Sequence, residues 1–364
     1  MSNNKLISYS SISELPIQAQ DFIAANDNGS VFLTVPWLKN LEETVFNKNK
    51  ICIYVLENSH GETQAVLPCL KFSDTLLGIS GNMCSSMTNY YSSHFSPIID
   101  QNSDRKTQQQ TLTELIASIK ATNLYNSFDF SQLDKNETSF KYFTEAAENS
   151  KYTVEPYFCF GNWYLELNNR SFDEYYNNLS SRLRNTIKRK TKKLEKEHTY
   201  RIQFITNETE LGKYIDDYNK IYHKSWKNKE PFPDFIPNLV NVAAKEGWLR
   251  MGILYVNEKP AASQLWFIYK GTANIYKLAY DEEFSKYSVG SILSKYLFEL
   301  VIDKDKVHTM DYLTGDDSYK QDWMSHRRER WGFRAYDNAS LFGVLNTIKY
   351  KVKNLLIKQK QGIN

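Results

Sequence analysis

Residues 272–301 read TANIYKLAYDEEFSKYSVGSILSKYLFELV. The first nine residues, Thr272 to Tyr280, are predicted to form a strand, and residues 292–301 place their apolar side chains on one face of a helix. Small residues lie in the turn between them. A helix that begins after such a turn directs backbone N–H groups and a positive dipole end at one point, where pyrophosphate binds well. We therefore expect an anionic ligand at Tyr287, Ser288, Val289, Gly290 and Ser291.

The flanking segments extend this pattern into an α/β domain. Strands are predicted upstream at 201–205, 249–256 and 261–269 and downstream at 309–314, and helices at 211–221 and 235–245. The strands 249–256 and 261–269 form a hairpin around Asn257-Glu258-Lys259-Pro260. The strand 309–314 runs into a polar segment, Gly315-Asp316-Asp317-Ser318-Tyr319-Lys320-Gln321-Asp322-Trp323.

A long amphipathic helix is predicted to open this half. Its apolar stripe runs from Phe172 to Ile187, and Ser171 with Glu174 forms a capping box at its start. Its continuation, residues 182–196, carries eight Lys and Arg and one Glu. Most of these charges are expected to form a solvated face, while Arg182 and Arg184 are candidates to bind a phosphate of the substrate.

The first half also reads as α/β and contains a hairpin of its own. Strands are predicted at 51–57 and 63–72 around Asn58-Ser59-His60-Gly61, and further strands at 76–79 and 127–130. The two hairpins share the order strand, polar turn, strand about 200 residues apart, which favours two copies of one fold. We expect domains at 1–156 and 157–340, divided by a turn at Glu155-Pro156, followed by a basic amphipathic helix at 341–364.

The strand, the turn around Tyr287-Ser288-Val289-Gly290, the helix and the segment Gly315 to Trp323 together resemble one family. They are similar to GNAT-superfamily acyltransferases of the cellulose-biosynthesis-associated branch, which are related to the Fem-type aminoacyl transferases. The basic helix SSRLRNTIKRKTKKLEKE is similar to the one that opens the second domain of that branch. The resemblance covers residues 160–335 and implies two tandem GNAT-like domains, each a mixed, mainly antiparallel sheet flanked by helices.

The resemblance also implies the chemistry. An N-acyltransferase would use acetyl-CoA or another acyl-CoA as co-substrate, with no bound cofactor, and would acylate an amino-sugar or cell-envelope polysaccharide precursor by direct attack of an amine on the thioester. Lys320 would hold a phosphate or a developing oxyanion, Tyr319 or Tyr280 would protonate the thiolate, and Asp316 or Asp311 would accept the proton of the amine. The substrate-binding candidates are Arg182, Arg184, Gln264 and Asp311.

The donor loop departs from the GNAT pattern of Gln or Arg, two residues, Gly, one residue, and Gly or Ala. The corresponding positions are Ser285, Ser288 and Gly290, so that only the last is retained. Two alternatives therefore stay open: transfer from aminoacyl-tRNA, as in Fem-type relatives, and a GNAT-fold protein that binds without catalysing.

Composition excludes other classes of protein. The 364 residues carry a net charge of +3, which calls for no DNA partner, and Cys52, Cys69, Cys84 and Cys159 lack metal-ligand spacing and are expected to be buried thiols. The six histidines form no ligand motif, so no metal site is expected. The absence of a secretory signal pattern or a long apolar run favours a cytoplasmic protein. No GxxxxGK[ST], GxGxxG or complete nucleophile-elbow sequence is present.

The C-terminal segment combines lysines with an apolar stripe. From Asn338 onward there is no Asp or Glu, and Leu341, Leu345, Ile348, Val352 and Leu355 recur at helical spacing. Such a helix either contacts an anionic membrane or packs its stripe on its own domain, and we expect the packing.

Overall fold

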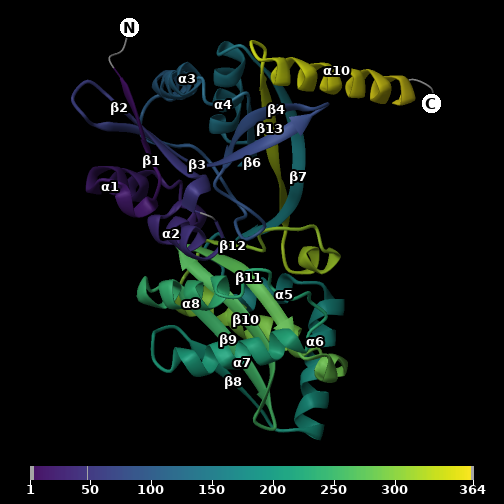
Figure 1. The fold of residues 1–364 in the computed structure, drawn as a ribbon. Helices are drawn as coiled ribbons and strands as arrows, with labels where there is room; N and C mark the ends of the chain where they lie inside the picture. The colour runs from purple at the N-terminus through teal and green to yellow at the C-terminus, as the bar shows by residue number, and fades with distance from the viewer. Residues whose placement is uncertain (1–3, 47, 362–364) are drawn as a thin grey trace. The chain divides into compact units, whose positions relative to one another are not determined.

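The computed structural model describes residues 4–46 and 48–361, and the last three residues of the expected C-terminal segment lie outside the described residues (Figure 1). The chain forms two compact units. The first comprises residues 1–160 together with 329–364, and the second comprises residues 161–328. Two strands, β7 (Tyr152–Glu166) and β13 (His326–Asp337), carry the chain from one unit into the other.

The first unit is a mixed sheet with helices. Its strand order is β1-β2-β3-β4-β6-β13-β7, and a short β5 also pairs with β3. The further strands are β1 (Lys5–Tyr9), β2 (Ile51–Glu57), β3 (Thr63–Leu76), β4 (Ile79–Ser86), β5 (Ile98–Ile99) and β6 (Ser127–Asp134). The helices are α1 (Ile17–Asn26), α2 (Val35–Thr44), α3 (Arg105–Ala121), α4 (Thr138–Asn149) and α10 (Leu341–Gln361). A buried cluster that includes Phe128, Phe130, Phe143 and Phe333 joins the sheet to α3 and α4.

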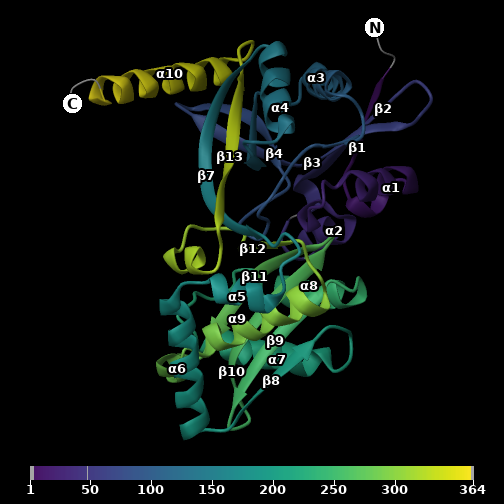
Figure 2. The ribbon, with the colours of Figure 1, turned by 180° about the vertical axis from the view of Figure 1, so that it is seen from behind.

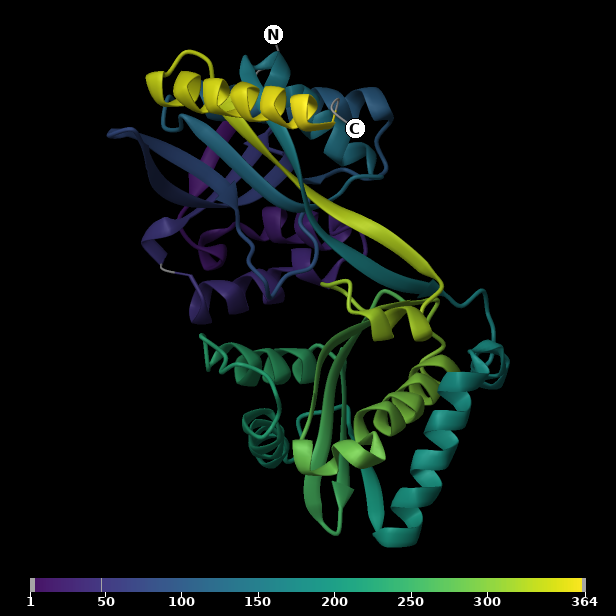
Figure 3. The same ribbon diagram turned by 90° about the vertical axis from the view of Figure 1, so that its right-hand side faces the viewer.

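The second unit repeats this plan. Its strand order is β7-β12-β11-β10-β9-β8, with β8 (Tyr200–Ile205), β9 (Leu249–Val256), β10 (Lys259–Tyr269), β11 (Thr272–Tyr280) and β12 (Thr309–Asp311). The helices are α5 (Phe172–Asn178), α6 (Ser181–Glu197), α7 (Leu211–His223), α8 (Phe235–Lys245) and α9 (Val289–Glu299). Figures 2 and 3 show α6 and α9 on one face of this sheet and α7 and α8 on the other.

Both units contain the same strand arrangement, which confirms the expected fold class. In the first, β2, β3 and β4 are antiparallel and β4 then pairs in parallel with β6; in the second, β9, β10 and β11 are antiparallel and β11 then pairs in parallel with β12. A parallel pair requires a crossover connection, which is supplied by α3 in the first unit and by α9 in the second. The two hairpins noticed in the sequence are β2–β3 and β9–β10.

The helix predicted over Phe172 to Ile187 is two helices. The capping box at Ser171 is present, but α5 ends at Asn178, Leu179 is extended, and the side chain of Ser180 accepts a hydrogen bond from the Leu183 backbone N–H to start α6. The stripe continues across the break because apolar side chains of both helices pack on the core of this unit. Periodicity alone therefore did not reveal the break, whereas Ser180 is a good N-cap residue.

The division of the chain differs from the expected boundaries in two ways. Pro156 lies inside the continuous strand β7 instead of a turn, which a proline tolerates because β7 is the last strand in the order of the first unit. Residues 329–340, expected in the second domain, belong to the first because β13 pairs with β6 there. This long-range pairing has no signature in local spacing.

Candidate functional site

The turn between β11 and α9 leaves the N-terminus of α9 accessible. Asp281 accepts a hydrogen bond from the Glu283 N–H to begin the short 3₁₀ segment η4 (Glu282–Tyr287), and Ser288 then takes a left-handed conformation with φ of 54°. Among the residues that the structure describes, no side chain caps the start of α9. The first N–H groups of the helix and its positive dipole end are therefore available to an anion.

The five expected turn residues divide into two groups. Tyr287 and Val289 are buried, and the Tyr287 hydroxyl is 2.5 Å from the Glu197 carboxylate and 2.9 Å from Nε2 of His198, so it fixes the turn to the end of α6. Ser288, Gly290 and Ser291 remain partly exposed. An added Cβ at Gly290 would contact the Tyr280 ring at 3.5 Å, an ordinary packing distance.

The edge of β11 opens beside this turn. β11 pairs with β12 only from Thr272 to Asn274, although β11 continues to Tyr280. The chain after β12 stays with β7, because the Tyr312 N–H bonds the Trp163 carbonyl at 2.9 Å and the Gly315 N–H bonds the Gly161 carbonyl at 3.2 Å. The two parallel strands thus separate, and the pairing of β11 with β12 does not extend to its last six residues, 275–280.

An aromatic pair and a half-buried lysine lie near the same end of β11. The rings of Trp226 and Tyr280 have centroids 4.6 Å apart. Lys227 follows Trp226 in the connection between α7 and α8. Burial and, after it, the neighbouring ammonium of Lys277 lower the pKa of Lys227 to about 8, although Glu230 and Asp317 raise it. An amine with this pKa exchanges protons close to neutral pH. We name Lys227, Lys277, Lys320, Glu230 and Asp317 the lysine cluster.

No sequence pattern pointed to Lys227. The run Lys227-Asn228-Lys229-Glu230 before Pro231 reads as a polar connection, and its relation to Lys277 on β11, where Lys277 is 2.7 Å from Glu230, is a tertiary contact. The one local signal for this site is that two basic residues and one acidic residue precede a proline-containing turn.

The segment after β12 holds three of the catalytic candidates. Asp316 forms an ion pair of 2.6 Å with Arg327, whose guanidinium lowers the pKa of that carboxyl. The Nζ of Lys320, which is buried, donates to the backbone carbonyls of Tyr312, Thr314 and Gly315 at 3.3, 2.5 and 3.2 Å. The pKa of Lys320 is lowered by burial. The ammonium of Lys320 therefore braces the turn in this structure.

Tyr319, the third of these candidates, is 44% exposed, and the buried part of its ring packs edge-on against Tyr312. Burial raises the pKa of Tyr319 to about 12. The fourth candidate, Tyr280, lies instead beside Gly290, in contact with the turn of residues 287–291 that the sequence predicts to bind the donor and that we name the donor turn. The structure thus places Tyr280 and Tyr319 on different segments of the second unit.

Two of the substrate-binding candidates are held inside the second unit. The Gln264 amide, 1% exposed, donates to the Gly290 carbonyl at 2.9 Å and to the Ser294 hydroxyl at 2.8 Å, so it ties β10 to the start of α9. Asp311 accepts from Asn162 at 2.6 Å and pairs with Arg328. The hydrogen bonds of Gln264 therefore hold the first turn of α9 on the sheet.

The other two candidates lie on α6. Arg182 is exposed, whereas Arg184 lines a pocket of about 390 Å³ between α5, α6 and α9. The residues lining this basic pocket are Tyr176, Arg184, Asn185, Ile187, Lys188, Thr191, Lys192, Lys295 and Tyr296. It contains four cations, and none of its described lining residues is acidic. Such a concentration of like charge favours an anionic ligand.

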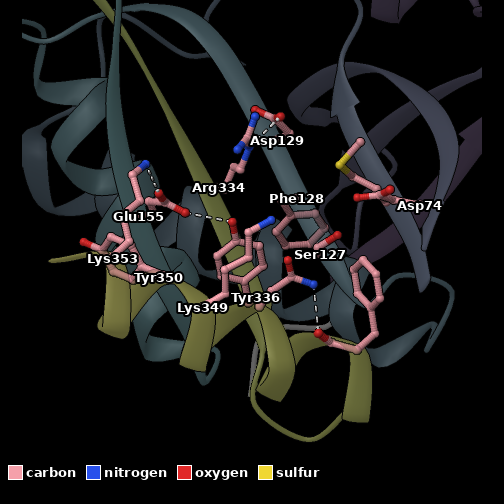
Figure 4. Close-up of a pocket in the computed structure, with 13 residues that line it drawn as sticks. Asp74, Ser127, Phe128, Asp129, Glu155, Arg334, Tyr336, Lys349, Tyr350 and Lys353 are labelled. Carbon is pink, nitrogen blue, oxygen red and sulfur yellow. Dashed lines mark hydrogen bonds and ion pairs between the residues drawn. The ribbon is translucent and has the colours of Figure 1, made fainter. Parts of the chain in front are cut away.

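A second polar cavity lies in the first unit, between α10 and the sheet, and has a volume of about 350 Å³ (Figure 4). Its charges are already compensated. Asp129 pairs with Arg334 at 3.1 Å, and Glu155 accepts from the Tyr336 hydroxyl at 2.8 Å and pairs with Lys353. The first two contacts join strands of the sheet, and the pair of Lys353 with Glu155 attaches α10 to it.

The sequence predicted that the four cysteines are buried thiols. Cys52, Cys69 and Cys84 are buried free thiols, and Cys159 is a half-buried one. In the described part of the chain, no group of three or more His, Cys, Asp or Glu is arranged to hold a metal ion. None of its helices is long and apolar enough to cross a bilayer.

Residues 181–321 match the acetyltransferase (GNAT) domain family. This segment runs from the start of α6 to η6 (Ser318–Asp322), so it includes the donor turn and the open edge of β11. This part of the second unit is therefore similar to a GNAT-type acetyltransferase domain. No curated protein matches the chain in sequence.

Three solved structures show the same fold over most of the chain. FemX matches with 9% identity and a TM-score of 0.62, covering 95% of this chain and 100% of that one. A conserved protein of unknown function from Bacteroides thetaiotaomicron VPI-5482 matches with 10% identity and a TM-score of 0.57, covering 92% and 100%. A tandem GNAT protein from the clavulanic acid biosynthesis pathway matches with 8% identity and a TM-score of 0.53, covering 92% and 98%. At such identities the likeness establishes the tandem GNAT fold and no more.

Proposed function

We propose that the second unit is an N-acyltransferase that takes its acyl group from a CoA thioester. The observation that carries this proposal is the early end of the β11–β12 pairing next to an uncapped N-terminus of α9. An open strand edge offers N–H and C=O groups to an extended arm bearing amides, and the helix start offers N–H groups to its pyrophosphate. A CoA thioester has both features in one molecule.

The proposed chemistry is direct transfer without a covalent enzyme intermediate. The amine nitrogen of the acceptor attacks the thioester carbonyl, the C–N bond forms, and the C–S bond breaks. The neutral amine of Lys227 accepts the proton that the acceptor loses, because the pKa of about 8 leaves part of it unprotonated near neutral pH. The Tyr280 hydroxyl, beside Gly290, gives a proton to the departing thiolate. Asp316 is a weaker base because its ion pair with Arg327 lowers its pKa.

The acceptor is proposed to be a phosphorylated amino-sugar or polysaccharide precursor. The basic pocket supports this choice, since a phosphate would partly neutralise its four cations, which form no ion pair among the described residues: Arg184, Lys188, Lys192 and Lys295. Replacing Lys192 and Lys295 with glutamine should raise the Michaelis constant for such an acceptor several-fold and leave turnover near normal, because uniform binding is lost.

One observation favours a second function. The basic helix α6 extends beyond the pocket, with Lys190 donating to the Lys286 carbonyl and Lys193 placed over the Tyr287 ring. A row of cations along one helix suits the phosphates of a nucleic acid, and transfer from aminoacyl-tRNA would then replace transfer from CoA. This alternative predicts tRNA affinity that falls steeply as salt rises.

Calorimetry with acetyl-CoA, longer acyl-CoAs and aminoacyl-tRNA distinguishes these functions. Gly290→Ala and Gly290→Glu make a matched pair, because a Cβ at this position meets the Tyr280 ring at a normal distance whereas a carboxylate brings bulk and negative charge to the donor turn. The alanine variant should bind acyl-CoA as the wild type does, and the glutamate variant should not bind it. If a folded Gly290→Glu protein bound acyl-CoA as tightly as the wild type, the donor site would lie outside this turn. If the wild type bound none of the donors, the chain would be a protein that binds a ligand without catalysing a transfer.

A further inference from the structure

The apolar stripe of α10 faces away from the unit to which the helix belongs. Its side chains are exposed to between 36% and 63% at Leu341, Val344, Ile348, Val352, Leu355 and Leu356. At 3.6 residues per turn these positions lie within about 120° of the helix circumference. The expectation that this stripe packs on its own domain is therefore wrong.

The opposite side of α10 makes the attachment. Phe342 is buried, and its ring occupies the space where a Cβ at position 81 would be. Only glycine, which has no Cβ, allows this contact at position 81. Thr347 is also buried, and Asn346 and Tyr350 line the polar cavity beneath the helix (Figure 4). Because the residues on this side, apart from Phe342, are mostly polar or small, the attachment does not use the apolar stripe, which is left to another partner.

The exposed stripe continues onto the neighbouring hairpin. Leu77, at the turn between β3 and β4, is 84% exposed, and together with Leu76 it forms an apolar groove of about 580 Å³ with residues of α10. The other lining residues of this groove are Leu345, Ile348, Lys349, Val352, Lys353, Leu356 and Ile357. Contiguous exposed apolar surface of this kind marks a site of interaction.

Lysines border the stripe on both sides. At 100° per residue, Lys349 and Lys353 fall along one border and Lys351 along the other. The chain contains no Asp or Glu after Asp337. A second copy of this surface would bring lysines against lysines, whereas an anionic bilayer offers acyl chains to the stripe and phosphates to the lysines.

We propose that α10 and the β3–β4 turn form a docking surface for an anionic lipid bilayer. The helix lies in the plane of the interface, with the stripe and Leu77 among the acyl chains and the flanking lysines at the headgroups. This binding is peripheral and does not depend on the transferase chemistry of the second unit.

Sedimentation of the full-length chain with vesicles tests the proposal. We expect binding to vesicles of equal phosphatidylcholine and phosphatidylglycerol, and little binding to phosphatidylcholine alone. The double variant Val352→Asp/Leu355→Asp should bind the mixed vesicles at least about ten-fold more weakly, because two apolar anchors are lost and two negative charges gained. Lys351→Gln should weaken binding about five-fold, the usual effect of one lysine near an anionic surface.

Asn354→Asp is the control for charge, since it adds one of the two negative charges of the double variant to the same helix, on the side away from the stripe. It should bind mixed vesicles much more tightly than the double variant does. Both substituted stripe residues are exposed, so circular dichroism should show an unchanged fold. Equal binding by wild type and double variant, or equal binding to neutral and anionic vesicles, would overturn the proposal. The proposal would also be overturned if the wild-type protein were a dimer that binds no vesicles and if the double variant were a monomer, because the stripe would then be a dimer interface.

Discussion

Replacing Lys227 with methionine should stabilise the protein at neutral pH, and the gain should disappear as the pH rises. The folded structure lowers the pKa of this amine from 10.5 to about 8, which is a shift of about 2.5 pH units. At about 1.4 kcal/mol per unit, keeping the amine charged in the fold costs on the order of 3 kcal/mol. Methionine has a similar length and no charge, so it removes this cost.

The direction of the pH dependence follows from proton linkage. Below pH 8 both the folded and the unfolded chain carry the charged amine, and the full cost is present. Between pH 8 and 10.5 the unfolded chain binds more protons at this site than the folded chain, so wild-type stability rises relative to Lys227→Met. The difference in unfolding free energy between the two proteins should therefore be largest near pH 7 and small near pH 10.

Urea unfolding at several pH values measures this difference, and Lys229→Met, at an exposed position of the same connection, is the control. The control should differ from wild type by less than about 0.5 kcal/mol at every pH. NMR titration of the dimethylated Lys227 amine reports the pKa directly. A difference that stays constant between pH 7 and 10, or an amine that titrates near 10.5, would refute the argument and remove Lys227 as the proposed base.

Three further outcomes are expected. Lys320→Met should lower the unfolding free energy by about 1–3 kcal/mol, because three backbone carbonyls lose their donor, and urea titration would show whether any fall in turnover accompanies this loss. Tyr287→Phe should cost about 1 kcal/mol and weaken donor affinity, since the hydroxyl holds the donor turn to Glu197; unchanged donor affinity in calorimetry would contradict this. Asp316→Asn should change stability by less than about 1 kcal/mol and leave turnover near that of the wild type, because the partly exposed pair with Arg327 is weak; a large fall in turnover would restore Asp316 as the base.

Local pattern was sufficient for most elements of the fold. The hairpins β2–β3 and β9–β10, the strand β11 and the helices α7, α8 and α9 lie within a few residues of their expected positions, because alternation, helical spacing and turn residues are properties of neighbouring residues. The position of the turn between β11 and α9 could also be predicted, since a strand, a small-residue turn and a helix follow one another directly in the chain, whereas its role in donor binding stays a prediction.

Contacts distant in sequence decided the rest. The strand β13 joined the first unit because it pairs with β6 about 200 residues earlier, and the pKa of Lys227 is lowered by burial and by Lys277 on another element. In α10 the sequence determined that one side is apolar and bordered by lysines. Only the tertiary structure determined which side faces outward, because that choice depends on the space that Gly81 leaves for Phe342 and on the polar cavity below the helix. Spacing along a chain determines which side chains share a face, whereas the shape and charge of the surface that the face meets determine its direction.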